Sequence, residues 1–126
     1  MQMMRTITDE TNAIEGAEFN NNNADDEGGA IEWKGANGII SNSAFNNNAI
    51  LGGAILWSGE NGIIINSAFN NNTAESGGAI YWHSEKGTVN NSTFNNNNAD
   101  DDGGAIYWNK ENSTIINSTI NNNSVE

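Results

Sequence analysis

Apolar residues recur along the chain in a fixed order, separated by short runs of asparagine, aspartate and glycine. A Gly-Gly-Ala-Ile motif begins at residues 28, 52, 77 and 103, at separations of 24, 25 and 26 residues. A tryptophan stands two residues after the isoleucine of each motif, and a large apolar residue stands twelve residues after each tryptophan. This invariant interval predicts strands that lie in register on their equivalents in the next unit.

The apolar columns of this repeat form the predicted core. They are an aromatic column (Phe19, Phe45, Phe69, Phe94 and Ile120), an isoleucine column (Ile31, Ile55, Ile80 and Ile106) and a tryptophan column (Trp33, Trp57, Trp82 and Trp108). Counting back from Phe19 places Ile7 in the tryptophan column, so the first 27 residues form a degenerate copy. We therefore predict one domain, residues 1–126, of about five rungs. Each has 24–26 residues, they start near residues 2, 28, 52, 77 and 103, and no cap follows the last.

The runs between turn signals are short and rich in β-branched residues, and no 3.6-residue apolar stripe appears, so they predict strands. A unit of this size cannot bury its own apolar face, but stacked copies can. The predicted fold is all-β, a right-handed parallel β-helix, or β-solenoid. Turns are expected at Asn37-Gly38 and Asn61-Gly62, and one strand over residues 87–94. Repeat length changes only between the aromatic residue and the next Gly-Gly, which predicts loops there, including Asp100–Asp102.

Alternation along the Gly-Ala-Ile-x-Trp run predicts which side chains face outward. The residue between Ile and Trp varies and is Glu32, Leu56, Tyr81 or Tyr107, so this column points outward. Leu56, Tyr81 and Tyr107 are therefore candidate surface contacts. The tryptophans would form a sugar-stacking stripe only if they faced outward, and their inward parity favours a place in the core.

Asparagine supplies 27 of the 126 residues, a bias that by itself is typical of disorder. Strict spacing favours a structural role, because stacked asparagines can pass amide hydrogen bonds from rung to rung. Two columns are predicted to form such ladders: Asn42, Asn66, Asn91 and Asn117, and, three residues after the aromatic column, Asn22, Asn48, Asn72, Asn97 and Asn123.

Composition narrows the range of partners. The formal net charge of −12 disfavours binding to nucleic acid and to anionic lipid, so we expect neither. Cysteine is absent, and no stretch approaches the roughly 20 apolar residues of a membrane-spanning helix. The first ten residues lack the apolar region of a signal peptide. We expect an extracellular or cell-surface protein that is a fragment of a longer secreted chain.

The sequence contains few residues that could form a metal-binding or catalytic site. Calcium could bind the acidic residues Asp25, Asp26, Asp100, Asp101 and Asp102, but they lack the alternating spacing of a dedicated calcium loop. His83 is the one histidine, and its column offers no second metal ligand. A carbohydrate-active enzyme would need carboxylates clustered with Lys or Arg on one sheet, whereas Lys34, Lys86 and Lys110 fall in turns after tryptophan. We expect no cofactor and no enzymatic activity.

The units, GGAIYW followed by NST-F-NNN, resemble two groups of repeats from about Phe19 to Asn123. They are similar to the adhesin-like GGAIYW/NSTF repeats of methanogenic archaea, and to the related GGA(I/L) and FxxN repeats of chlamydial polymorphic outer-membrane proteins. The resemblance implies a secreted, cell-surface, right-handed β-helix with a role in attachment.

Three functions follow as hypotheses. The first is a non-enzymatic adhesin-like module that serves as scaffold and contact surface for a host-cell or microbial surface protein or glycan. The second is an extracellular filament subunit that stacks end to end on further copies of itself. A fragment of a carbohydrate-active β-helix enzyme is the remote third.

Overall fold

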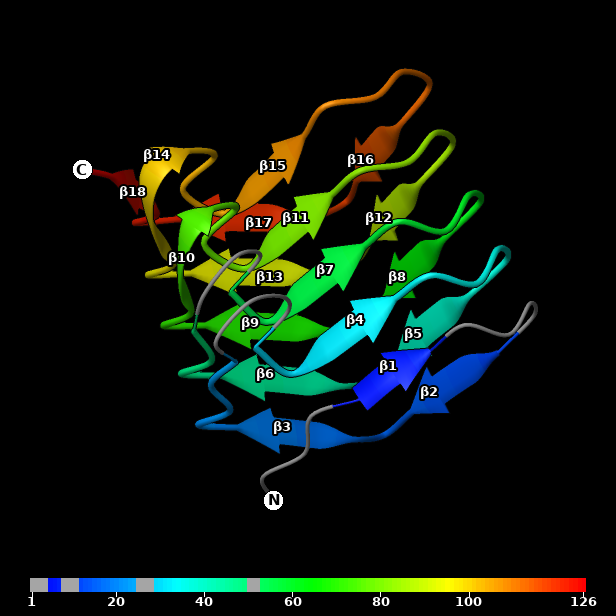
Figure 1. Cartoon of the computed structure of the whole chain (residues 1–126), viewed down its shortest axis with the longest axis horizontal. Coiled ribbons are helices and arrows are strands. Elements are labelled where there is room, and N and C mark those ends of the chain that lie inside the picture. Colours follow the sequence, from blue (N-terminus) through cyan, green and yellow to red (C-terminus); the bar gives the residue numbers. More distant parts are fainter. Residues whose placement is uncertain (1–4, 8–11, 25–28, 50–52) are drawn as a thin grey trace.

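The computed structural model describes residues 5–7, 12–24, 29–49 and 53–126. Every regular element in these ranges is a short β-strand, and the strands stack as parallel sheets along a single axis (Figure 1). Each turn of the chain adds one strand to each of three sheets, so the architecture is the predicted β-solenoid. Five strands per sheet correspond to about four complete turns between the first strand of a sheet and its last.

The first sheet carries the Gly-Ala-Ile-x-Trp runs. Its strands, in spatial order, are β1 (Arg5–Ile7), β4 (Ile31–Trp33), β7 (Ile55–Trp57), β11 (Ile80–Trp82) and β15 (Ile106–Trp108). Their register places Ile7 opposite Trp33, and Trp33 opposite Trp57. The degenerate first unit therefore occupies the position that the twelve-residue interval predicts.

The second and third sheets are formed by segments that the sequence predicted as one strand per turn, for example residues 87–94. The second contains β2 (Ala13–Glu15), β5 (Ile39–Ser41), β8 (Ile63–Ile65), β12 (Thr88–Asn90) and β16 (Thr114–Ile116). The third contains β3 (Glu18–Asn20), β6 (Ala44–Asn46), β9 (Ala68–Asn70), β13 (Thr93–Asn95) and β17 (Thr119–Asn121). The prediction of a single strand over 87–94 is wrong, because the chain bends between β12 and β13.

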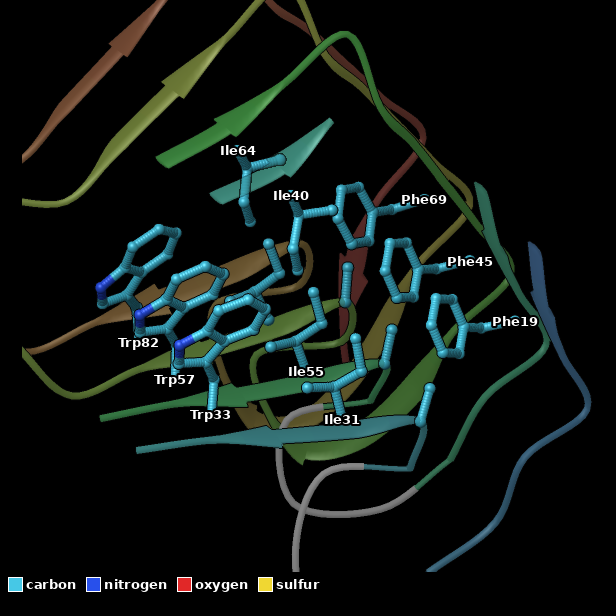
Figure 2. Packing of buried hydrophobic residues seen from close by; sticks show 14 of the residues in the cluster. Phe19, Ile31, Trp33, Ile40, Phe45, Ile55, Trp57, Ile64, Phe69 and Trp82 are labelled. Atoms are coloured by element: carbon cyan, nitrogen blue, oxygen red, sulfur yellow. The ribbon is translucent and has the colours of Figure 1, made fainter. Parts of the chain in front are cut away.

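The core consists of side chains stacked in columns, as Figure 2 shows for Trp33, Trp57 and Trp82 and for Phe19, Phe45 and Phe69. Phenylalanine rings from successive turns lie 4.7 Å apart and within 3° of parallel. Tryptophan rings stack 4.5–4.7 Å apart. These distances match the roughly 4.8 Å between neighbouring strands, so each ring packs face to face on its equivalent.

The last turn leaves this core open. Ile120 lies opposite Phe94 but is 48% exposed, whereas Phe94 is fully buried. Ile106 and Trp108 are half-buried and pack against the core cluster. The predicted core columns are therefore continuous, but Ile106, Trp108 and Ile120 are covered only by the preceding turn.

The predicted asparagine ladder at the corner after the third sheet is confirmed. The Nδ2 of Asn48 donates to Oδ1 of Asn72 at 3.0 Å and to the backbone oxygen of Phe19, while its Oδ1 accepts from Asn22. The same arrangement continues through Asn97 to Asn123. Asparagine suits this column because a buried amide needs donors and an acceptor satisfied together.

The second predicted ladder, at Asn42, Asn66, Asn91 and Asn117, is wrong. These side chains are exposed, and their φ angles of 48–53° are left-handed. They form the bend between the second and third sheets, and the bend interrupts the in–out alternation on which the prediction rested.

Serine, one residue later, is the buried polar column at this bend. Ser43, Ser67 and Ser92 are at most 3% exposed. The Oγ of Ser67 donates to the backbone oxygen of Ile65 at 3.0 Å and accepts from the backbone nitrogen of Ser43 at 3.3 Å. A hydroxyl can do both, which explains why serine recurs here.

A fourth sheet replaces the loop predicted around Asp100–Asp102. It contains β10 (Thr73–Ser76), β14 (Asn98–Asp102) and β18 (Ser124–Val125), and isolated bridges at Ala49 continue it toward the first turns. The register shifts between Ala74 and Ser76, where Ser76 pairs with Asp102. This irregularity absorbs the extra residue of the later repeat, as β-bulges do.

Candidate interaction surface

The outer face of the first sheet carries the only large aromatic side chains that face outward in the described chain. In β4, β7 and β11 the middle residue is half-buried, and its two neighbours are buried. Tyr81 of β11 and Tyr107 of β15 occupy this middle column with Leu56, and Tyr81 pairs with both. The candidate contacts Leu56, Tyr81 and Tyr107 thus lie side by side on neighbouring strands, which Figure 1 shows as β7, β11 and β15.

The two tyrosines form a fixed aromatic group with the residues that follow. Their ring centroids are 4.9 Å apart with planes inclined by 42°. The His83 ring lies 6.2 Å from that of Tyr81. Asn109 joins the group, because its Nδ2 donates to the Tyr81 hydroxyl at 3.2 Å and its Oδ1 lies 2.8 Å from Nδ1 of His83. We call Tyr81, His83, Tyr107 and Asn109 the aromatic cluster.

This contact sets the chemistry of His83. The amide oxygen of Asn109 can only accept, so the tautomer of His83 that carries its proton on Nδ1 can donate to it. In the neutral ring, Nε2 is then left as an acceptor. His83 is exposed, so this acceptor is available to a molecule that reaches the sheet.

An open hollow of about 260 Å³ adjoins the aromatic cluster where the chain turns from the first sheet to the second. It spans three successive turns and is lined by Ser58, Glu60, His83, Ser84, Glu85 and Lys110. His83 belongs to both the hollow and the aromatic cluster. The two features therefore form one continuous surface, with aromatic rings on one side and carboxylates, hydroxyls and an ammonium on the other.

Ser84 anchors the floor of the hollow to the core. It is 5% exposed, accepts from Nε1 of Trp82 at 2.9 Å and donates to the backbone oxygen of Gly59 at 2.7 Å. Trp33, Trp57 and Trp82 are 0% exposed, and Trp108 is half-buried against the core, so the tryptophans do not form an outward stripe.

The acidic candidates for calcium are placed only in part. Asp100, Asp101 and Asp102 are exposed on β14, while Asp25 and Asp26 lie outside the described residues. Among the described residues, no three His, Cys, Asp or Glu side chains are grouped so that they could hold a metal ion. Calcium binding remains a prediction.

The sequence predicts the outward tyrosines and Leu56 but not the other two members of the aromatic cluster. His83 was predicted only not to be a metal ligand, and nothing was predicted for Asn109. A signal was present, because both stand two residues after an outward tyrosine and so share its parity. The hollow depends on side chains from three turns, and a single repeat does not reveal it.

Comparison with known proteins places the fold in a family. A family model described as a right handed beta helix region matches residues 6–126. Comparisons with curated proteins and with solved structures gave no match. In the ranges that the structure describes, no helix is long and apolar enough to cross a membrane.

Proposed function

This chain belongs to the family of right-handed β-helix regions, and on that premise we propose that it is a non-enzymatic, adhesin-like attachment module. It acts at the cell surface, within a longer secreted protein, by presenting the outer face of its first sheet to a surface protein or glycan. Its GGAIYW and NSTF repeats, which resemble those of archaeal adhesin-like proteins and of chlamydial polymorphic outer-membrane proteins, support this proposal.

One observation carries the proposal: Leu56, Tyr81 and Tyr107 are half-exposed in register on adjacent strands, although the fold does not need large apolar residues there. The same column holds Glu32 in an earlier turn, so the architecture accepts a charged residue at this position. Partly exposed aromatic residues are enriched where proteins contact their partners.

Most of the other repeated residues have structural roles. Asn72 and Ser67 hold buried ladders, Asn66 forms a bend, and Phe69 and Trp57 fill the core. The variable outward positions are therefore where a specific contact would evolve. A scaffold of this kind needs no cofactor.

Attachment of the purified chain to a panel of microbial and animal cells tests the proposal. We expect saturable binding that falls at least tenfold when Tyr81→Ser and Tyr107→Ser are combined, about 1.4 kcal/mol of binding free energy. Thr73→Ser, exposed on β10, is the matched control and should bind like the original chain. Binding no stronger than that of an unrelated acidic protein would refute the attachment role.

A filament subunit is the second candidate, because each turn stacks in register on the next and a second copy could continue that stacking. Ile115, Ile116, Ile120 and Val125 are 43%, 43%, 48% and 50% exposed, whereas Ile64, in the column of Ile115, is fully buried. A second copy stacked on this turn would cover these residues and pair the open strand edges.

Sedimentation velocity over a hundredfold concentration range, with negative-stain images, tests the filament. Threads of constant width that disappear with Ile120→Asp would support it. Single particles at all concentrations would exclude it, and this result would leave the attachment role intact.

A further inference from the structure

We propose that the aromatic cluster and the adjoining hollow form a binding site for a neutral oligosaccharide. The inference rests on the proposed attachment role only in that it names the ligand of the same surface. The geometry of the rings, the hydrogen-bonding groups, the size of the hollow and its charge all support this ligand.

The rings supply an apolar shelf of the right kind. Tyr81 and Tyr107 are half-exposed, and their centroids are held 4.9 Å apart by the strand register. A sugar ring has one face lined by C–H groups, which packs on an aromatic ring and leaves its hydroxyls at the rim. A site already fixed by β-sheet register costs little ordering entropy when the ligand binds.

The polar groups at the edge of the shelf match hydroxyls. When His83 is neutral with its proton on Nδ1, its Nε2 can accept. The Tyr81 hydroxyl can donate, and Asn109 Nδ2 has a second proton beyond the one that it gives to Tyr81. A sugar hydroxyl is donor and acceptor at once, so it can satisfy such mixed groups. Asn109 holds Tyr81 and His83 in place and thus positions two of these groups before the ligand arrives.

The hollow suits a single sugar unit. Its volume of about 260 Å³ lies just below the roughly 300–1,000 Å³ of pockets that enclose a drug-sized ligand, and it is open to solvent. One unit on the floor at Ser84 would contact Glu60 and Glu85, whose carboxylates accept from hydroxyls. The next unit along the same oligosaccharide would lie on the tyrosine shelf.

Charge selects against acidic sugars. The hollow has two carboxylates, of Glu60 and Glu85, and one ammonium, of Lys110, and the whole chain carries −12. Uronate, sialic acid and sulfated units would be repelled. The expected ligand is therefore a neutral oligosaccharide.

Binding of soluble sugars to the full chain tests the inference. The probes are neutral pentasaccharides of glucose, mannose, xylose and N-acetylglucosamine, with an oligogalacturonate as the acidic comparison. Amide shifts in ¹⁵N-labelled protein and calorimetry report binding at up to about 10 mM sugar, which detects a millimolar Kd. We expect at least one neutral probe to bind and to shift the amides of residues 81–84 and 107–110, and the oligogalacturonate not to bind.

Variants distinguish the contribution of the Tyr81 ring to sugar binding from that of its hydroxyl. Tyr81→Ala and Asn109→Ala should each weaken binding at least tenfold, whereas Tyr81→Phe, which keeps the ring, should weaken it less. Asn71→Gly is the control, because Asn71 is exposed in a left-handed bend away from the site. Unchanged thermal unfolding shows that each variant is folded.

Three outcomes overturn the inference: no neutral probe binds, the oligogalacturonate binds as well as the neutral probes, or the Tyr81 and Asn109 variants bind unchanged. A cell-attachment assay distinguishes failure of the oligosaccharide site from failure of the proposed attachment role. Attachment that soluble sugars do not compete would refute the oligosaccharide site and keep the attachment role. Sugar binding without cell attachment would refute the attachment role and keep the oligosaccharide site.

Discussion

The indole of Trp57 lies directly against Gly62, five residues later in the same turn of the solenoid. A Cβ atom on Gly62 would come within 2.5 Å of the indole Cε2. Trp33 has the same relationship with Gly38, and Trp82 with Gly87. The glycine that follows the left-handed residue of this turn, Asn37, Asn61 or Lys86, therefore also makes room for the tryptophan column.

Replacing Gly62 with Ala should destabilise the chain because the new methyl group would overlap the stacked indole. Overpacking of this kind costs about 1–3 kcal/mol. Urea unfolding followed by tryptophan fluorescence measures the loss. Gly16→Asn is the control: no atom lies within 4 Å of a Cβ there, and asparagine occupies the equivalent bend at Asn42. It should change stability by less than about 0.5 kcal/mol.

Asn72→Ala should be among the most destabilising single changes in the described chain. Asn72 is fully buried, and its amide bonds to Asn48, Asn97 and the backbone oxygen of Phe45. The alanine leaves several of these groups unsatisfied, at about 1–3 kcal/mol each. Thermal unfolding against Asn71→Gly, the exposed neighbour, measures the difference. Equal melting temperatures would mean that the ladder does not hold the turns together.

Substitutions of Asn66 test the left-handed bend between the second and third sheets. With φ at 53°, Asn66→Ala should cost about 1–2 kcal/mol, the usual penalty for a left-handed residue. Asn66→Gly should be nearly neutral, because glycine adopts this conformation freely. If instead both changes destabilise equally in chemical denaturation, the side-chain amide matters more than the backbone conformation.

Ser84→Ala should destabilise by about 1–3 kcal/mol, because it leaves Nε1 of Trp82 and the backbone oxygen of Gly59 without their partner. Differential scanning calorimetry is the measurement, with exposed Ser58→Ala as the reference. A loss no larger than that of the reference would show that the two hydrogen bonds add little.

The repeat predicted the register but not the corners. The constant interval from Trp33 to Phe45 was sufficient to predict Trp33 opposite Trp57 and Phe45 opposite Phe69, because parallel stacking requires equal spacing. The prediction for the bend between the second and third sheets was wrong because asparagine at position 42 and serine at position 43 recur equally well in later turns. Once a left-handed residue intervenes, alternation cannot tell which of the two side chains points inward. Backbone conformation, not periodicity, decides that choice.

The fourth sheet and two residues of the candidate site, His83 and Asn109, were not predicted, for different reasons. Asp100–Asp102 looks like a loop because three aspartates disfavour a strand, yet pairing with Thr73–Ser76 overrides that propensity. The outward tyrosines followed from alternation. The contact of Asn109 with Tyr81 and His83 depends on side chains from adjacent turns, which residue types alone do not specify.

The hydrogen bonds between turns, such as that from Asn48 to Asn72, run along the stacking axis. Tension applied between the first turn and the last would therefore act on all these interfaces in series, and the weakest would separate first. Each detached turn of 24–26 residues would release roughly 80–90 Å of slack chain. In the proposed attachment role, such stepwise yielding would dissipate a pull before the bond between the chain and its partner is strained.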